Sequence, residues 1–178
     1  MRRRIFAGAA LSVLTLGVVG VALADTGAMS DPSGDVKHNP PGKNSKYDIV
    51  KIAYGHRGED LLAKVKTKGN IFGPGNPYTP LLWIDVPGKV ASRPGCNYSD
   101  YLVADGEVQE CGEGPVTGSA TITKVSDHVD KFVFSPSSIG SPSKYGEAFV
   151  EEGSGPNGLV FFDRAPNNFD KFLVHHLG

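Results

Sequence analysis

The segment Asp48–Thr67, DIVKIAYGHRGEDLLAKVKT, predicts the fold of this chain. Two extended runs, DIVKIAY and LLAKVKT, flank the connection GHRGED, in which two glycines lie. Side chains on a strand alternate between two faces, so Ile49 and Ile52 are expected on opposite faces, while Leu61 and Val65 share one. The segment therefore predicts an antiparallel β-hairpin.

Further extended runs follow as far as the C-terminus. LLWIDV places Leu82 and Ile84 on one face and Trp83 on the other, and YLVADGEVQEC contains Asp105-Gly106, a dipeptide typical of hairpin turns. Five more runs have the same character: SATITKV, DKFVFSP, YGEAFVEE, GLVFFDRAP and KFLVHHL. About eight to ten short strands without helical periodicity predict an all-β protein, an antiparallel two-sheet β-sandwich of the Ig-like or jelly-roll type.

The first residues have the composition of a secretory signal. Arg2–Arg4 are positively charged, Ile5–Gly20 are almost wholly apolar, and Ala22-Leu23-Ala24 fits a cleavage site. The alternative is an uncleaved membrane anchor, because the apolar run is about long enough to span a bilayer. The expected organisation is a signal peptide at 1–24, an N-terminal segment with an Asp-rich loop at 25–47, and the β-sandwich domain at 48–178.

Charge and cysteine content limit the partners and the compartment. Removing Arg2–Arg4 with the signal leaves 15 of the 18 basic residues against 19 acidic ones, a net charge of about −4. Such a surface, without a basic run, argues against nucleic acid and against an anionic membrane as partners. In an oxidising compartment the two cysteines, Cys96 and Cys111, are expected to form a disulfide; two free thiols are the alternative. We therefore expect a secreted, extracellular protein.

Motifs for catalysis are missing from the sequence. It contains no Gly-x-Ser-x-Gly, no His-Glu-x-x-His and no glycine loop for phosphate. The histidines are scattered, and the adjacent pair His175-His176 would point to opposite faces of a strand. Two distant carboxylates can converge in a glycoside hydrolase, but no pair stands out. We therefore expect no catalytic residues, and keep a glycoside hydrolase-like enzyme as the less favoured alternative.

Three aspartates gather just before the first clear strand. Asp31 and Asp35 lie four residues apart across Pro-Ser-Gly, and Asp48 begins the strand. Ca²⁺ takes six to eight oxygen ligands and is often bound by loops rich in Asp, Gly and Asn. The alternative is structural, because Asp-Pro-Ser-Gly is by itself a type I turn signature. Either a turn or a calcium loop is predicted here.

The order of motifs resembles that of secreted bacterial β-sandwiches similar to family 9 carbohydrate-binding modules and DOMON domains, including the C-terminal module of glucodextranase-type enzymes. The shared features are Asp31-Pro-Ser-Gly-Asp35, then Asp48-Ile49, Trp83-Ile84-Asp85, Asp100-Tyr101, SPSSIG at 135–140, and Asp163-Arg-Ala-Pro166. The likeness covers about residues 31–177. It implies a structural Ca²⁺ site made by Asp31, Asp35 and Asp48, with Asp163 as a further candidate ligand.

The resemblance also implies a sugar-binding role. Such modules stack sugars on exposed aromatic rings, and the candidates here are Trp83, Tyr78 and Tyr101. The single tryptophan departs from the pair of aromatic residues that the family leads us to expect. The predicted function is a non-catalytic, calcium-stabilised domain that binds a glycan or another cell-envelope polymer. The alternative is a structural or protein-interaction domain of the cell surface.

Overall fold

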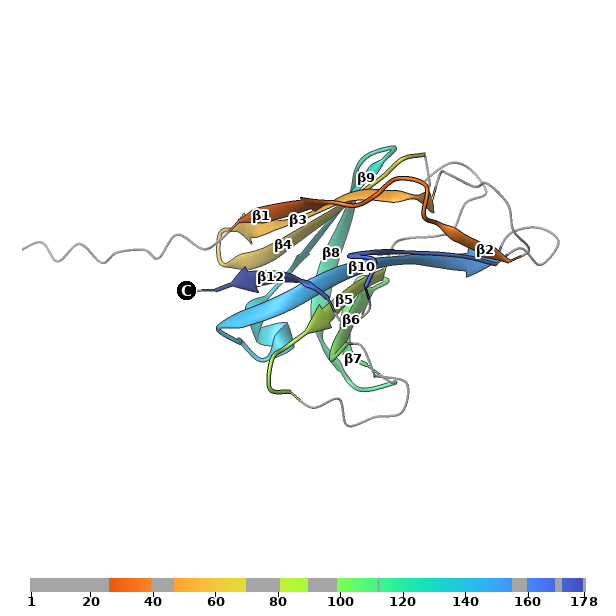
Figure 1. Ribbon diagram of the computed structural model, residues 1–178. Coiled ribbons are helices and arrows are strands. Elements are labelled where there is room, and N and C mark those ends of the chain that lie inside the picture. The colour runs from red at the N-terminus through yellow and green to blue at the C-terminus, as the bar shows by residue number, and fades with distance from the viewer. Residues whose placement is uncertain are drawn as a thin grey trace, which may run out of the picture.

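The computed structural model describes residues 26–39, 47–69, 81–89, 99–111, 113–154, 160–168 and 171–177. This part of the chain is all-β and forms one antiparallel, twelve-stranded sheet (Figure 1). The strands are β1 (Gly27–Ser30), β2 (Lys37–Asn39), β3 (Ile49–Arg57), β4 (Asp60–Thr67), β5 (Leu81–Asp85), β6 (Tyr101–Ala104), β7 (Glu107–Glu110), β8 (Val116–Ser126), β9 (Val129–Phe134), β10 (Lys144–Ser154), β11 (Val160–Ala165) and β12 (Leu173–His176). A short 3-10 helix (Pro136–Ile139) follows β9.

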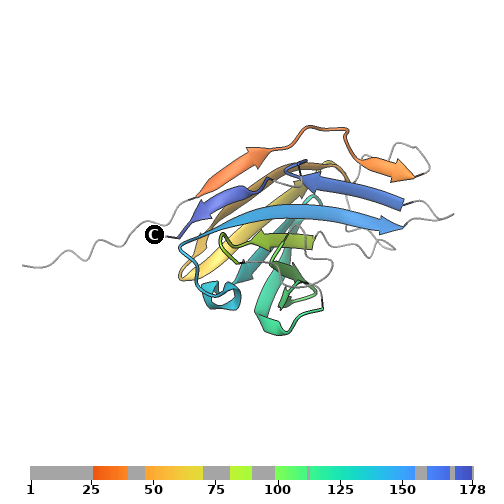
Figure 2. The ribbon, with the colours of Figure 1, turned by 60° about the horizontal axis from the view of Figure 1, so that its bottom comes forward.

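The sheet curls until its two flanks face each other (Figures 1 and 2). Its order is β1-β3-β4-β9-β8-β7-β6-β5-β10-β11-β2, and β12 also pairs with β10. The long strand β8 joins the flanks, because its first residues pair with β7 and the rest pair with β9. Phe132 on β9 meets Phe149 on β10 with ring centroids 5.3 Å apart. The apolar core therefore lies inside the curl, between β3, β4 and β9 on one side and β5, β6 and β10 on the other.

Most of the expected strands are confirmed. β3 and β4 form the predicted hairpin, and Leu61, Ala63 and Val65 share its buried face. β6 and β7 pair through the expected turn, in which Asp105 has φ 50° and Gly106 has φ 86°. These left-handed values suit the Asp-Gly dipeptide of a tight hairpin.

One expectation about the faces of β3 is wrong. Ile49 and Ile52 are both fully buried, although strict alternation places them on opposite faces. The register of β3 on β4 shifts between Ile49 and Lys51, so Val50 is an extra, bulged residue. A bulge inserts one residue without a partner and turns the following side chains to the other face. It thereby brings both isoleucines into the core.

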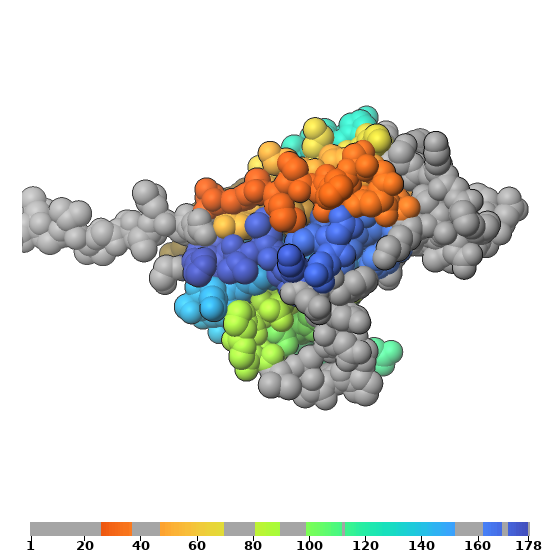
Figure 3. Space-filling model, viewed as in Figure 1, coloured from red at the N-terminus to blue at the C-terminus, as the bar shows by residue number. Residues whose placement is uncertain are grey.

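The N-terminal segment is part of the sheet rather than a leader to it. β1 and β2 precede the strand that the sequence indicates as the first. β1 pairs with β3, and β2 pairs with β11, almost at the other end of the sheet order. Figure 3 shows the atoms of this segment lying against those of β11 and β12. The turn between β1 and β2 therefore crosses from one flank to the other.

The expected signal peptide, residues 1–24, lies outside the described residues. Among the residues that the structure describes, there is no helix long and apolar enough to cross a membrane.

Candidate metal centre

Four acidic residues meet where the N-terminal segment crosses the sheet. Asp31 follows β1, Asp35 precedes β2, and Asp163 lies on β11; one carboxylate oxygen from each falls within 4.8 Å of the others. Asp31 and Asp163 are buried, and Asp35 is half-buried. Asp48 is fully buried beside them, at the start of β3. The sequence prediction thus named four residues that the fold brings together, with Asp163 more central than Asp48.

Asp48 holds the turn that carries the first two aspartates. Its Oδ2 accepts hydrogen bonds from the main-chain N–H of Gly34 at 2.8 Å and from the hydroxyl of Ser33 at 3.0 Å. The ammonium of Lys68 lies 3.7 Å from the same oxygen. Asp48 therefore fixes the Pro-Ser-Gly turn through charge-assisted hydrogen bonds.

Two carboxylate oxygens in the group receive no hydrogen bond from the described part of the chain. Oδ1 of Asp35 and Oδ1 of Asp48 are buried and have no hydrogen-bond partner among the described residues. A buried carboxylate oxygen without a donor destabilises the folded state, because it has lost its hydration and no hydrogen bond compensates for that loss. A bound cation would satisfy such oxygens.

Asp163 links the acidic group to the rest of the sheet. Its Oδ2 accepts a 2.6 Å hydrogen bond from the main-chain N–H of Ile49, and its Oδ1 accepts one of 2.9 Å from the N–H of Arg164. In the register of β10 on β11, Glu151 lies directly opposite Asp163. Glu151 is itself fully buried, and neither of its carboxylate oxygens has a partner among the described residues. A further buried carboxyl group thus lies beside Asp163, on the neighbouring strand β10.

Sequence reasoning missed Asn167, which belongs to the group. Its amide nitrogen donates to Oδ2 of Asp35 at 2.6 Å and to both oxygens of Asp31 at 3.2 and 3.3 Å. The neighbouring Arg164 fixes the loop that carries Asn167, because its guanidinium donates to the carbonyls of Pro166, Asn168 and Lys171. The side-chain NH₂ group of Asn167 thus lies between the carboxylates of Asp31 and Asp35, at a position where a positive charge would be favoured.

The electrostatics of the group favour a cation. Burial raises the pKa of Asp31 to about 7, and the charges of Asp35, Asp163 and Asp48 add to this shift. Burial also raises the pKa of Asp163 to about 7, although the hydrogen bonds from Ile49 and Arg164 oppose the shift. Carboxyl groups that are hard to ionise together become easier to ionise when a cation binds among them. The oxygen-only donor set suits Ca²⁺, which accepts irregular geometry.

The candidate aromatic residues do not form an exposed platform in the described structure. Tyr101, expected as a stacking surface, is only 5% exposed and packs in the core, because it shares the inner face of β6 with Val103. Trp83 is half-buried on the outer face of β5, with the guanidinium of Arg164 6.0 Å from its ring. Tyr78 lies outside the described residues.

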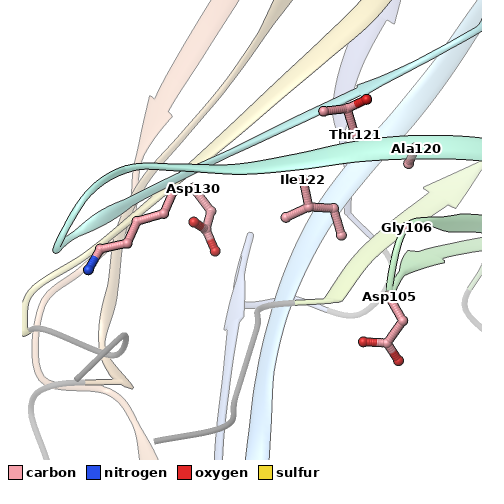
Figure 4. Close-up of a pocket in the computed structure, with 7 residues that line it drawn as sticks. Asp105, Gly106, Ala120, Thr121, Ile122 and Asp130 are labelled. Carbon is pink, nitrogen blue, oxygen red and sulfur yellow. The ribbon is translucent and has the colours of Figure 1, made fainter. Parts of the chain in front are cut away.

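A hollow of about 580 Å³ opens beside β8. Its lining comes from the β6–β7 turn, from β8 and from β9: Asp105, Gly106, Ala120, Thr121, Ile122, Lys124 and Asp130. Figure 4 shows Ile122 and Asp130 on the side of these two strands that faces the turn. Asp130 is almost fully buried, and burial raises its pKa to about 6, although Lys124 opposes this shift. A volume of this size is typical of small-ligand sites, and carboxylates beside aliphatic surface suit a ligand with hydroxyl groups.

The predicted disulfide lies partly outside the described residues. Cys111 directly follows β7 and is half-buried, and none of the described cysteines is free. Its expected partner, Cys96, is not among the described residues. The Cys96–Cys111 pairing therefore stays a prediction.

Comparison of the chain with protein-family models, with curated proteins and with solved structures gives no match. The function is therefore inferred from the fold and from the two sites described above.

Proposed function

We propose that this chain is a secreted, non-catalytic binding domain that Ca²⁺ stabilises. The observation that carries the proposal is the convergence of Asp31, Asp35 and Asp163, with ligand oxygens within 4.8 Å of one another. They come from two segments about 130 residues apart in sequence. The buried Oδ1 atoms of Asp35 and Asp48 support the same conclusion, because no described residue donates a hydrogen bond to them and a cation would satisfy them.

Ca²⁺ would act here as a structural cross-link. Asp31 and Asp35 belong to the segment between β1 and β2, whereas Asp163 belongs to β11. An ion bound by all three would neutralise their mutual repulsion and tie the N-terminal segment to β11. In such a protein we infer that the flanks form the two layers of a β-sandwich, and that residues 1–24 are removed on export.

The proposed ligand is a glycan or another polymer of the cell envelope. The support comes from the resemblance to carbohydrate-binding modules and from the hollow beside β8. There Asp105 and Asp130 offer acceptors for sugar hydroxyls, and Ala120 and Ile122 offer aliphatic surface. Trp83 is the second candidate location, because it is half-buried rather than fully buried on the outer face of β5.

Calorimetric titration of the purified, chelator-treated protein with CaCl₂ tests the metal part of the proposal. We expect one saturable site in the unaltered protein and in the control Asp127→Asn, since Asp127 lies on the surface and its ion pair within the described residues is with Lys124. We expect loss of that site in Asp35→Asn. Equal calcium binding by Asp35→Asn and the unaltered protein would contradict the proposed site.

Retention on insoluble cell-wall polysaccharides tests the ligand. Binding that is lost in Ile122→Trp, which fills the hollow, but kept in Trp83→Ala would assign the sugar to the hollow; the reverse pattern would assign it to the face of β5. Melting curves show whether each variant is folded. No retention on any polysaccharide, by a folded and calcium-loaded protein, would contradict a glycan-binding role.

A further inference from the structure

We infer that His56 and His175 form a second cation site, which takes a first-row transition-metal ion such as Zn²⁺. His56 lies on β3 and His175 on β12, 119 residues apart in sequence. Their Nε2 atoms are 2.9 Å apart. This pair shares no residue with the acidic group and offers nitrogen rather than oxygen, so it selects a different class of ion.

The two rings face each other edge to edge. Their centroids are 4.8 Å apart and their planes are inclined at 72°, so the Nε2 atoms lie on the facing edges of the two rings. Two imidazole nitrogens at this distance share one proton, which one ring donates and the other accepts. A divalent ion that replaces this proton is bound by both lone pairs.

The required movement is small. Zn–N bonds are about 2.0–2.1 Å long, and at a tetrahedral centre two such nitrogens lie roughly 3.3–3.4 Å apart. The pair must therefore open by about half an ångström from its 2.9 Å separation. His56 is only half-buried, so its side chain can make this movement, and water can reach the remaining coordination positions.

A supporting shell already fixes His175. The residue is fully buried, its ring stacks on Tyr54 with centroids 4.2 Å apart, and its Nδ1 lies 2.9 Å from the hydroxyl of Tyr145. Histidines that bind metal almost always engage their other ring nitrogen in this way, which orients the ring and sets its tautomer. The arrangement that a metal site needs around one ligand is therefore already present.

A buried carboxylate strengthens this shell. Glu147 lies two residues after Tyr145 on β10 and is fully buried. Burial raises the pKa of Glu147 well above its ordinary value, and the neighbouring Tyr145 hydroxyl opposes this shift. A cation at the histidine pair would add a favourable charge to a part of the core that now contains an acidic group.

Titration with Zn²⁺ in saturating Ca²⁺, followed by NMR of the histidine ring protons, tests the inference. We expect the signals of His56 and His175 to shift together and to saturate at one ion per chain. His56→Ala should lose this binding by at least about tenfold, whereas His176→Ala should keep it, because His176 is exposed on the opposite face of the same strand. Tyr145→Phe keeps the ring and removes the hydroxyl, so we expect about a tenfold weaker affinity.

The inference would be overturned if the unaltered protein showed no saturable Zn²⁺ binding, or if His56→Ala bound Zn²⁺ as tightly as the unaltered protein. The Asp35→Asn variant separates this site from the proposed calcium site. We expect it to bind Zn²⁺ as the unaltered protein does, and loss of Zn²⁺ binding in a folded Asp35→Asn variant would also contradict the histidine site.

Discussion

The carboxylate of Asp163 on β11 accepts a 2.6 Å hydrogen bond from the main-chain N–H of Ile49, the first residue of β3. The two residues are 114 positions apart and belong to opposite flanks of the curled sheet. The same aspartate approaches Asp31 and Asp35 of the N-terminal segment. Asp163 therefore joins three parts of the fold at one point, and that point is where we place the calcium ion.

The acidic group predicts an unusual dependence of stability on pH. Unfolded aspartates titrate near pH 4, whereas the pKa values of Asp31 and Asp163 are raised to about 7 in the fold. Between these values the folded state binds more protons than the unfolded state, so the free energy of unfolding falls as the pH rises. We expect the melting temperature of the calcium-free protein to fall by several degrees from pH 5 to pH 8.

Asp130 and Glu151 should also make the protein less stable as the pH rises, because burial raises their pKa values to about 6 and about 9. Saturating Ca²⁺ should weaken the pH dependence, since it stabilises the ionised form of Asp31 and Asp163. Asp31→Asn should weaken it without calcium. A calcium-free melting temperature that rises from pH 5 to pH 8 would show that these carboxyls are not held in the protonated form.

β8 packs so closely against the 3-10 helix that adding a single methyl group at Gly118 is predicted to destabilise the fold. A Cβ on Gly118 would lie 2.0 Å from Oγ of Ser138, which is itself buried. Gly118→Ala should therefore lower the free energy of unfolding by about 1–3 kcal/mol. The matched control is Gly55→Ala on β3, where the nearest atom would be at 3.6 Å. Urea titration of the two variants measures the difference, and equal stability would contradict this packing.

The predicted Cys96–Cys111 disulfide would close a loop of 15 residues that contains the β6–β7 hairpin. In the chain-entropy model such a loop contributes about 3 kcal/mol. We expect mass spectrometry of unreduced peptides to find the two cysteines linked. Cys96→Ser should lower the midpoint of urea unfolding, and reducing agent should then have no further effect. A free thiol count of two in the oxidised, native protein would reject the pairing.

Much of the fold was predictable because each strand alternates in composition. In LLWIDV and LLAKVKT the alternating apolar residues predict which face is buried, and the dipeptide Asp105-Gly106 predicts the hairpin turn. Alternation identifies a face but not a partner, so the pairing of β2 with β11 could not be read from the chain. The bulge at Val50 could not be predicted either, because the composition of a strand does not show which residue lacks a partner on the next strand.

The candidate site was predictable in part. Asp31, Asp35 and Asp48 occur close together in the sequence, and Asp163 entered through the resemblance. Asn167 was missed because an isolated amide in a loop carries no signal. Tyr101 was misread as a surface residue, although its two-residue spacing from Val103 indicated an inward-facing side chain. The His56–His175 contact joins residues 119 positions apart and depends wholly on long-range packing, so the sequence carries no signal for it.

The most direct test of the account is the melting temperature with and without calcium. For an ion that binds only the folded state, a hundredfold excess over Kd adds about 2.7 kcal/mol, which corresponds to roughly 5–10 °C for a chain of this size. We predict that a chelator lowers the melting temperature of the unaltered protein and of Asp127→Asn by about this amount, and that Asp35→Asn shows no such difference. An unaltered protein whose melting curve is the same in excess calcium and in chelator would contradict the proposed metal centre.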